Sequence, residues 1–473
     1  MDDFISSLQP QVLPLTVLDT QGSFSNIPFV FFYENKTGSS DFMPTDMLRD
    51  SFFRTMKTFP FFAGRLKSKG LGNVSIVVDP RNVNMPDYSE DSSDVHFDEL
   101  KDAGFRWSAW PAGVATAGAM TKADSRGEIK LINVHVVRLK ENSGVIIYFS
   151  IPHYVVDGES HMGVMIRWCE VYQLMSSGQQ DAVDDLPGFA FDRAIISKHL
   201  PVERAPLDSE MQMAYTSHSY LADWFAWISP NTRGYLLDKV IGRQHAATHL
   251  FHVSAAAIES LRASLREHLP EADEISVNEL LLSLTTKTLV QAQQTAGCGD
   301  GKGQTTLPIA VIFETRKLLN LTRQDYIGNV LMPKLTIRSV EDLTLPTSTE
   351  TLAKMITINS ETARDVSAPL FGSFVDMVLG QPSSFTRPVV RYVRSKSAIS
   401  FVYDTMPDMY EADFGNGRPE WVSPIEPFRA NATLLLTPRD TTDGVDVFLT
   451  ALPKAMEEVL KNEFWMSIAK LIY

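Results

Sequence analysis

The segment that most constrains the fold places a strand, a tight turn and a helix one after another. Residues Gly144–Ile151 are an apolar run, which predicts a buried strand. The turn Pro152-His153-Tyr154-Val155-Val156-Asp157-Gly158 follows, and residues 160–174 predict a helix. A histidine at the end of a strand can face a cleft, where it can deprotonate an alcohol or an amine. An acyl transfer based on such a histidine needs no metal, prosthetic group or covalent intermediate.

The length and composition of the chain indicate a folded protein with more than one core. At 473 residues it exceeds the roughly 250–300 residues at which a single core stops growing, so two domains are expected. Hydrophobic residues make up 44% and charged residues 21%, which is typical of globular proteins. The formal net charge of −14 favours neither nucleic acid nor an anionic membrane as a partner.

The sequence gives no signal for export, membrane insertion or metal binding. The N-terminus is acidic and lacks a basic flank followed by an apolar stretch, so no signal peptide is expected. No apolar run reaches the roughly 18–20 residues that span a bilayer. Two cysteines, Cys169 and Cys298, lie far apart and form neither a disulfide framework nor a metal cluster. Low cysteine use suits a reducing compartment, so we expect a cytoplasmic protein. We also expect a monomer.

Apolar patterns and turn residues predict elements in both halves of the chain. The first half is expected to contain a strand at 28–33, a helix from 45 toward 58, strands near 74–78, and a hairpin formed by 129–137 and 144–151. The second half is expected to contain a strand at 249–253, a helix at 255–268 capped by Ser254, a helix at 277–293 with a capping box of Ser276 and Glu279, and a fully buried strand at 307–313.

A stretch rich in prolines and charges, from Pro201 to about Glu210, predicts the connection between two domains. We therefore divide the chain into an N-terminal domain at 1–195, a crossover at 196–225 and a C-terminal domain at 226–473. The aromatic residues at 215–227 leave two interpretations open. They form a helix packed into a core, or they form a lid or channel wall near an apolar substrate.

The H-x-x-x-D-G pattern is short and gains weight from other motifs in the chain. These are Phe61-Phe62-Ala63-Gly64-Arg65-Leu66, then Arg316, then Tyr326-Ile327-Gly328-Asn329, and finally the turn Asp413-Phe414-Gly415-Asn416-Gly417. In order and spacing, the chain resembles the BAHD-type acyl-CoA-dependent acyltransferases, whose matching stretches read YPLAGRL, HxxxDG, R-to-YFGN and DFGWG. The resemblance extends from about Pro10 to Leu460. The length and the looser motifs are most similar to those of fungal members, such as the trichothecene acetyltransferases.

The resemblance implies both a fold and an activity. The fold would be α/β, with two similar-sized chloramphenicol-acetyltransferase-like domains, mixed sheets and an interdomain channel. Acyl-CoA would enter the channel as a co-substrate from one face, and a small-molecule alcohol or amine would enter from the other. The product would be an acylated secondary metabolite. No permanently bound cofactor and no metal is implied.

The resemblance also assigns roles to individual residues around the histidine. His153 would be the general base in a direct, ternary-complex attack. Asp157 would be structural and would pair with Arg316, because a buried charge without a partner costs about 3–5 kcal/mol. Gly158 would allow close approach of the backbone. Asn329 is a candidate donor to the oxyanion, and a backbone N–H near Gly158 is the alternative.

The C-terminal motif is assigned to the arrangement of the domains or to the shape of the CoA site. The residues that carry this assignment are Asp413, Phe414, Gly415 and Gly417. Asn416 stands where plant members usually have tryptophan, which indicates a non-plant lineage. Asp404 lies near a position at which many members place a tryptophan facing the acceptor. It indicates either a polar or cationic acceptor or an acid in a surface loop.

Residues for binding the CoA phosphates are less defined by the sequence. Ser254, Lys287 and Arg316 are candidates by region only. His161, one turn into the helix after the motif, is interpreted as a packing or surface residue and not as a second base.

Two other interpretations compete with acyl transfer from acyl-CoA. A condensation-type domain would take its acyl group from a carrier protein, but such domains usually show H-H-x-x-x-D-G, and Pro152 occupies the first histidine position. A family member without chemistry would act as a ligand-binding or regulatory protein. The intact His153, Asp157 and Gly158 argue against this second rival.

Overall fold

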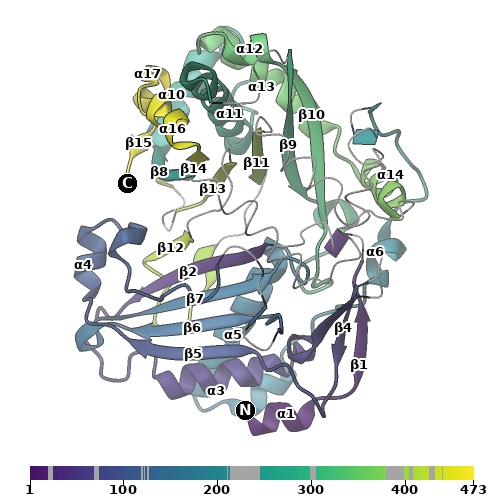
Figure 1. Cartoon of the computed structure of the whole chain (residues 1–473), viewed down its shortest axis with the longest axis vertical. Coiled ribbons are helices and arrows are strands. Elements are labelled where there is room, and N and C mark those ends of the chain that lie inside the picture. Colours follow the sequence, from purple (N-terminus) through teal and green to yellow (C-terminus); the bar gives the residue numbers. More distant parts are fainter. Residues whose placement is uncertain are drawn as a thin grey trace.

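A computed structural model describes residues 1–16, 18–19, 25–68, 74–118, 121, 123–124, 127–209, 211–212, 246–298, 305–379, 399–403, 409–425, 432–438, 440 and 442–473. Figure 1 shows the first half of the chain in the lower part of the molecule and most of the second half in the upper part. The segment 215–227 and Asp404 lie outside the described residues. The division of the chain at residues 195 and 225, and the interdomain channel, stay predictions.

A five-stranded mixed sheet forms the centre of the lower part. Its strand order is β12-β2-β7-β6-β5, and only the β5–β6 pair is parallel. The strands are β2 (Asn26–Glu34), β5 (Asp87–Ser92), β6 (Asn133–Arg138), β7 (Gly144–Pro152) and β12 (Trp421–Pro424). The predicted strand at 28–33 and the predicted hairpin before the histidine are confirmed by β2, β6 and β7.

Alternation along β2 explains why this sheet is covered on both faces. Phe29 and Phe31 belong to one hydrophobic cluster, whereas Val30 and Phe32 belong to another on the opposite face. The first face packs under α3 (Thr45–Met56) and α5 (Gly158–Ser176), and the second packs under α4 (Phe97–Asp102). β7 is buried along its whole length, as expected for a continuous apolar run.

Smaller elements complete the lower part of the molecule. They are α1 (Asp2–Ser7), α6 (Ala194–His199), a three-stranded sheet of β1 (Gln11–Pro14), β4 (Val74–Val78) and β3 (Arg65–Ser68), and the 3-10 turns at Pro60–Ala63, Trp107–Ala109, Lys140–Asn142 and Gln180–Asp185.

A seven-stranded mixed sheet forms the upper part, in the order β10-β9-β11-β13-β14-β8-β15. Its strands are β8 (Ala247–Ser254), β9 (Thr306–Glu314), β10 (Leu331–Ser339), β11 (Ile399–Tyr403), β13 (Ala432–Leu436), β14 (Gly444–Ala451) and β15 (Lys470–Leu471). The associated helices are α10 (Ala255–Leu265), α11 (Val277–Ala296), α12 (Val340–Thr344), α13 (Thr349–Arg364), α14 (Ala368–Leu379), α16 (Pro453–Val459) and α17 (Glu463–Ile468), with 3-10 turns at Lys317–Leu319 and Met409–Glu411. β11 runs parallel to both neighbours, and the other pairs are antiparallel.

The helix starts of the second half follow the predicted caps. The Oγ atom of Ser276 accepts from the N–H of Glu279 at 3.1 Å, and a carboxylate oxygen of Glu279 accepts from the N–H of Ser276 at 3.0 Å, which confirms the capping box. Ser254 caps α10 in the predicted way, but that helix ends at Leu265 instead of His268.

Strand β12 departs from the order of the sequence. It belongs to the C-terminal part of the chain, yet it pairs antiparallel with β2 and lies beside it in Figure 1. The sheet of the first half is therefore completed by a segment from the second half. This crossing fixes how the two parts of the molecule are joined.

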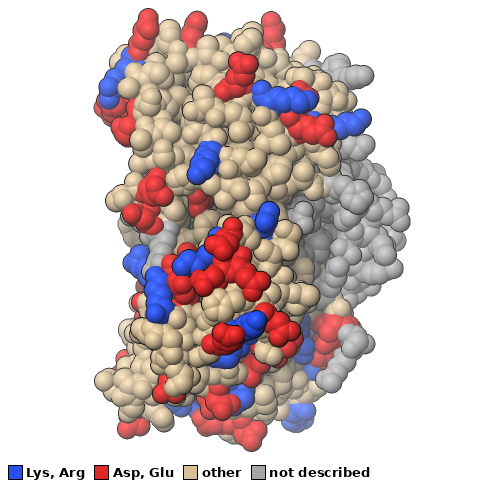
Figure 2. Space-filling model, turned by 90° about the vertical axis from the view of Figure 1, so that its left-hand side faces the viewer, with Lys and Arg blue, Asp and Glu red and all other residues tan. Residues whose placement is uncertain are grey.

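The described surface carries mixed charge. On the face drawn in Figure 2, acidic and basic side chains lie next to one another and no broad basic patch is visible. Among the described residues, no helix combines the length and the apolar character that crossing a membrane requires.

Candidate active site around His153

His153 lies directly after β7 and before α5, in the strand, turn and helix order that the sequence predicts. Its backbone N–H donates to the carbonyl of Ser25 at 2.8 Å. Helix α5 begins at Gly158 because Asp157 is its N-cap and accepts from the N–H of Ser160 at 2.9 Å. His153 is partly accessible, whereas residues 154–157 of the turn are buried.

Asn329 determines which nitrogen of His153 carries the proton. Its amide nitrogen lies 2.9 Å from the backbone carbonyl of His153 and 3.3 Å from a carboxylate oxygen of Asp19, and both of these groups only accept. The amide oxygen therefore faces Nδ1 of His153, at 2.9 Å. In the neutral ring, Nδ1 must carry the hydrogen, and Nε2 keeps the lone pair that a base needs.

Burial of His153 lowers its pKa, and the negative charge of Asp157 only partly opposes this effect. The ring is therefore neutral near pH 7. A neutral imidazole whose Nδ1 hydrogen is donated to an amide oxygen, and whose lone pair is on Nε2, is a suitable general base.

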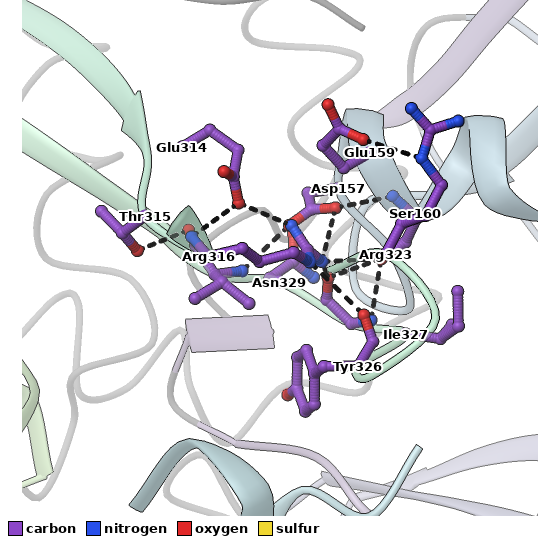
Figure 3. Close-up of polar contacts among 12 residues, drawn as sticks. Asp157, Glu159, Ser160, Glu314, Thr315, Arg316, Arg323, Tyr326, Ile327 and Asn329 are labelled. Atoms are coloured by element: carbon purple, nitrogen blue, oxygen red, sulfur yellow. Dashed lines mark hydrogen bonds and ion pairs between the residues drawn. The ribbon is translucent and has the colours of Figure 1, made fainter. Parts of the chain in front are cut away.

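Asp157 and Arg316, for which the resemblance implied an ion pair, lie side by side in Figure 3. Two guanidinium nitrogens of Arg316 contact the two carboxylate oxygens of Asp157 at 2.7 and 3.0 Å. The exposed fractions of these side chains are 2% and 0%. Burial raises the pKa of Asp157, but the charge of Arg316 and hydrogen bonds from Ser160 and Val330 outweigh it and lower the pKa overall. Asp157 is therefore held as an anion by Arg316 and by the backbone.

A second carboxylate shares the same arginine. Glu314, the last residue of β9, accepts from the backbone N–H of Arg316 at 2.9 Å and from its guanidinium at 2.8 Å. Burial raises the pKa of Glu314, and Arg316 opposes that rise. Figure 3 shows Arg316 between Glu314 and Asp157. No motif in the sequence predicts this second contact.

Asp19 and Arg193 are two further buried ionisable residues that the sequence reading missed. Their carboxylate and guanidinium lie 3.1 Å apart, and both contact segments next to His153. A lone aspartate in the apolar segment Leu15–Asp19 is a weak signal for the first. Arg193 has no local signal, because its partners are more than 30 residues away in the sequence.

The turn at Asp413 is remote from the histidine. Its carboxylate accepts from the N–H groups of Gly415 and Gly417 at 2.7 and 3.0 Å, and its carbonyl accepts from the side chain of Gln173 at 2.6 Å. Gln173 lies in the last turn of α5, about 22 Å along the helix axis from Gly158. The φ angles of 87° and 100° at the two glycines explain why glycine occupies them.

Phe414 and Arg316, which the sequence places among the candidates for the CoA site, have buried side chains. Phe414 is 1% exposed, and its ring packs against those of Tyr33, Trp168 and Tyr172. Arg316 is equally buried. Their assignment to cofactor binding stays a prediction. Asn416, by contrast, is exposed.

The other candidates have structural surroundings. Ser254 caps α10, and the ammonium of Lys287 is buried against the carbonyls of Asp342 and Leu343 at 3.1 and 3.4 Å. Burial lowers the pKa of Lys287 to about 8. His161 packs against the rings of Phe29 and Phe149, in agreement with its interpretation as a packing residue.

Comparison with known proteins decides the family. A profile described as the Transferase family matches residues 6–465. The chain belongs to this family. This family comprises the BAHD acyltransferases that the motifs indicated. The protein is therefore an acyl-CoA-dependent acyltransferase. No curated protein sequence matches the chain.

Solved structures with a similar fold cover almost the whole chain. TRI101 of F. graminearum, in complex with coenzyme A and deoxynivalenol, is 13% identical with a TM-score of 0.72, over 98% of this chain and 100% of that one. Vinorine synthase is 15% identical with a TM-score of 0.61, over 98% of each chain. The first condensation domain of the CDA synthetase is 14% identical with a TM-score of 0.58, over 96% of this chain and 94% of that one. These likenesses establish the fold of the acyltransferase.

Proposed function

We propose that the enzyme transfers an acyl group from acyl-CoA to a hydroxyl or amine of a small secondary metabolite, with His153 as the general base. The observation that carries this proposal is the hydrogen bond between Nδ1 of His153 and the amide oxygen of Asn329, because it places the hydrogen of the neutral ring on Nδ1 and so keeps the basic lone pair on Nε2. The lowered pKa of His153 supports it, since the ring is neutral at the pH of the cytoplasm.

The reaction follows directly from this arrangement. As the acceptor oxygen or nitrogen forms a bond to the thioester carbonyl carbon, its proton moves to Nε2 of His153. Collapse of the tetrahedral intermediate then breaks the carbon–sulfur bond, and the CoA thiolate takes the proton back from His153. No nucleophile of the enzyme is needed, so both substrates bind before either product leaves.

Asn329 orients the base in this proposal and does not bind the oxyanion. Both hydrogens of its amide nitrogen already have acceptors, on His153 and on Asp19. The first turn of α5, which starts at Gly158, provides the alternative donor named from the sequence. Its N–H groups lie at the positive end of a 19-residue helix, where developing negative charge is stabilised.

The acceptor class is inferred from the neighbours. The TRI101 structures contain T-2 mycotoxin or deoxynivalenol together with coenzyme A. A hydroxylated small molecule is therefore our first choice for the acceptor of this enzyme.

The test measures thiol release from a panel of acyl-CoAs, with and without a pool of hydroxylated and aminated small molecules. We expect acceptor-dependent release that the His153→Ala variant lacks, while titration with CoA gives the same affinity for both proteins. Release in the wild type without any acceptor would contradict the ternary complex. No release with any acyl-CoA would favour a carrier-protein donor, as in the condensation domains, or a ligand-binding role, and titration with CoA would separate these two.

A further inference from the structure

The loop Ile327–Val330, which holds Asn329, is fixed by two buried Asp–Arg pairs and not by one. The first pair is Asp157 and Arg316. The guanidinium of Arg316 donates to the carbonyl of Gly328 at 2.6 Å, and the N–H of Val330 donates to Asp157 at 2.9 Å. These contacts hold the second and fourth residues of the loop.

The second pair is Asp19 and Arg193, and it holds the first and third residues of the same loop. Arg193 donates to the carbonyl of Ile327, and the N–H of Asn329 donates to Asp19 at 3.1 Å. Arg193 also donates to the carbonyl of Val155, inside the H-x-x-x-D-G turn, at 3.1 Å. The pair thus connects the N-terminal segment, the histidine turn and the 327–330 loop.

Stability alone does not explain this second pair. The side chains of Asp19 and Arg193 are 0% and 6% exposed, and the desolvation of two such charges offsets most of their attraction. Gly328 adds a further constraint, since a Cβ atom there would collide with the guanidinium of Arg193. The chain therefore maintains a close and specific contact whose main consequence is the geometry of the loop.

We propose that Asp19 and Arg193 are positioning residues for the base: Asp19 holds the amide of Asn329 in the orientation that presents its oxygen to Nδ1 of His153, and Arg193 holds Asp19. This inference rests on the proposed role of His153. It assigns a function in catalysis to a fully buried residue of the N-terminal segment that acts through Asn329.

The effect of Asp19→Asn follows from the donors that surround the carboxylate. One oxygen of Asp19 faces the N–H and hydroxyl of Thr16 and the guanidinium of Arg193, and the other faces the N–H and side-chain nitrogen of Asn329. Asparagine has only one oxygen, so one of these sides must face an NH₂ group. If the NH₂ group faces Asn329, it opposes the side-chain NH₂ of that residue. The amide of Asn329 would then rotate, and its nitrogen would face Nδ1 of His153.

The experiment compares Asp19→Asn with Asp208→Asn in the full-length enzyme. Asp208 forms a partly buried ion pair with Lys334 at 2.6 Å and contacts no residue of the His153 site, so this variant is the matched control. Four quantities are measured: kcat and KM across pH, the affinity for CoA, and the tautomer of His153. The tautomer is read from ¹⁵N NMR of histidine-labelled protein, assigned with a His153→Gln variant.

We expect kcat of Asp19→Asn to fall about 10²-fold, as misplaced catalytic groups do, with little change in KM or CoA affinity. The NMR spectrum should show a new population of His153 with the hydrogen on Nε2. Asp208→Asn should change none of kcat, KM, the affinity for CoA and the tautomer of His153. Wild-type kcat together with a wild-type tautomer in Asp19→Asn would overturn the proposal.

A second variant keeps the proposal testable where Asp19→Asn does not fold. Asn329→Ala leaves the Asp19–Arg193 pair in place and should lower kcat to a similar extent, with loss of the single tautomer. A folded double variant should fall no further than Asn329→Ala, because both residues act through the same contact. Full additivity, or a wild-type tautomer in Asn329→Ala, would refute it. An active His153→Ala enzyme would instead refute the proposed function itself.

Discussion

The turn at His153 and the turn at Asp413 lie at opposite ends of helix α5, and their aspartates have different partners. Asp157 is fully buried and contacts an arginine and a backbone N–H from the loop after β9. Asp413 is half-buried, and its carboxylate accepts from the N–H groups of Gly415 and Gly417 in its own turn. The carboxylate of Asp157 connects segments from both parts of the molecule, whereas that of Asp413 shapes its own turn, Asp413–Gly417.

The two turns also bind the parts of the molecule together in different ways. Around His153 the contacts are polar and charged, and they set the orientation of a ring. Around Asp413 they are apolar, because Phe414 fills an aromatic cluster on α5 and β2. Two motifs that identify one family therefore have different physical roles, and variants in them should fail in different ways.

The largest expected effect comes from removing the partner of Asp157. Arg316→Met keeps an unbranched side chain but leaves a buried carboxylate without its cation, which should lower the free energy of unfolding by about 3–5 kcal/mol. Urea unfolding would measure this loss, and thiol release should be abolished. Adding Asp157→Asn should restore part of the stability and none of the activity. A double variant no more stable than Arg316→Met would show that the uncompensated charge is not the cause.

Phe414→Ala should lower stability but not the turnover of folded enzyme. The ring is fully buried, and truncation of such a side chain costs about 3–5 kcal/mol through lost contacts and the cavity that remains. Phe414→Leu, the matched control, should lose less. The check is kcat measured well below the unfolding transition. A fall in kcat in proportion to the stability loss would remove the distinction between the two turns.

Local patterns in the sequence were sufficient for the frame of the site. The apolar run of β7 and the capping box at Ser276 are each decided by residues close to one another in the sequence. The end of α10 was placed three residues too late, because no glycine follows Leu265 to mark it.

The partners within the site could not be predicted in the same way. Asn329 carries both a donor and an acceptor, so its residue type is equally suited to an oxyanion and to an imidazole. The backbone carbonyl of His153 and the contact with Asp19 together separate the two roles. That contact joins residues 310 positions apart. The crossing of β12 into the first sheet is equally remote from any local pattern.

Acid should destabilise the enzyme through His161, a buried histidine of helix α5. Burial lowers the pKa of His161 to about 4, whereas a histidine of the unfolded chain has a pKa of about 6.5. Between these values the unfolded chain binds a proton that the folded protein does not. The free energy of unfolding should therefore fall as pH drops from 6.5 to 4, by up to about 3 kcal/mol from this group.

The His161→Leu variant tests this prediction. Without the imidazole, the free energy of unfolding should decline less steeply over the same pH range. Urea unfolding at pH 7 and at several values down to pH 4 would measure the slope. An unchanged slope would place the acid sensitivity elsewhere, for example on His153, whose pKa is also lowered by burial.

The smallest effect is expected where α5 meets the Asp413 turn. Gln173→Met removes the hydrogen bond from the amide nitrogen to the carbonyl of Asp413, and because Gln173 is exposed, water can replace it. We expect a stability loss of about 1 kcal/mol or less and an unchanged kcat. A thermal shift assay and thiol release at saturating substrate would measure both. Because this contact lies about 22 Å from Gly158 along a continuous helix, a loss of kcat here would mean that the position of α5 as a whole, and not only the 327–330 loop, determines the orientation of His153.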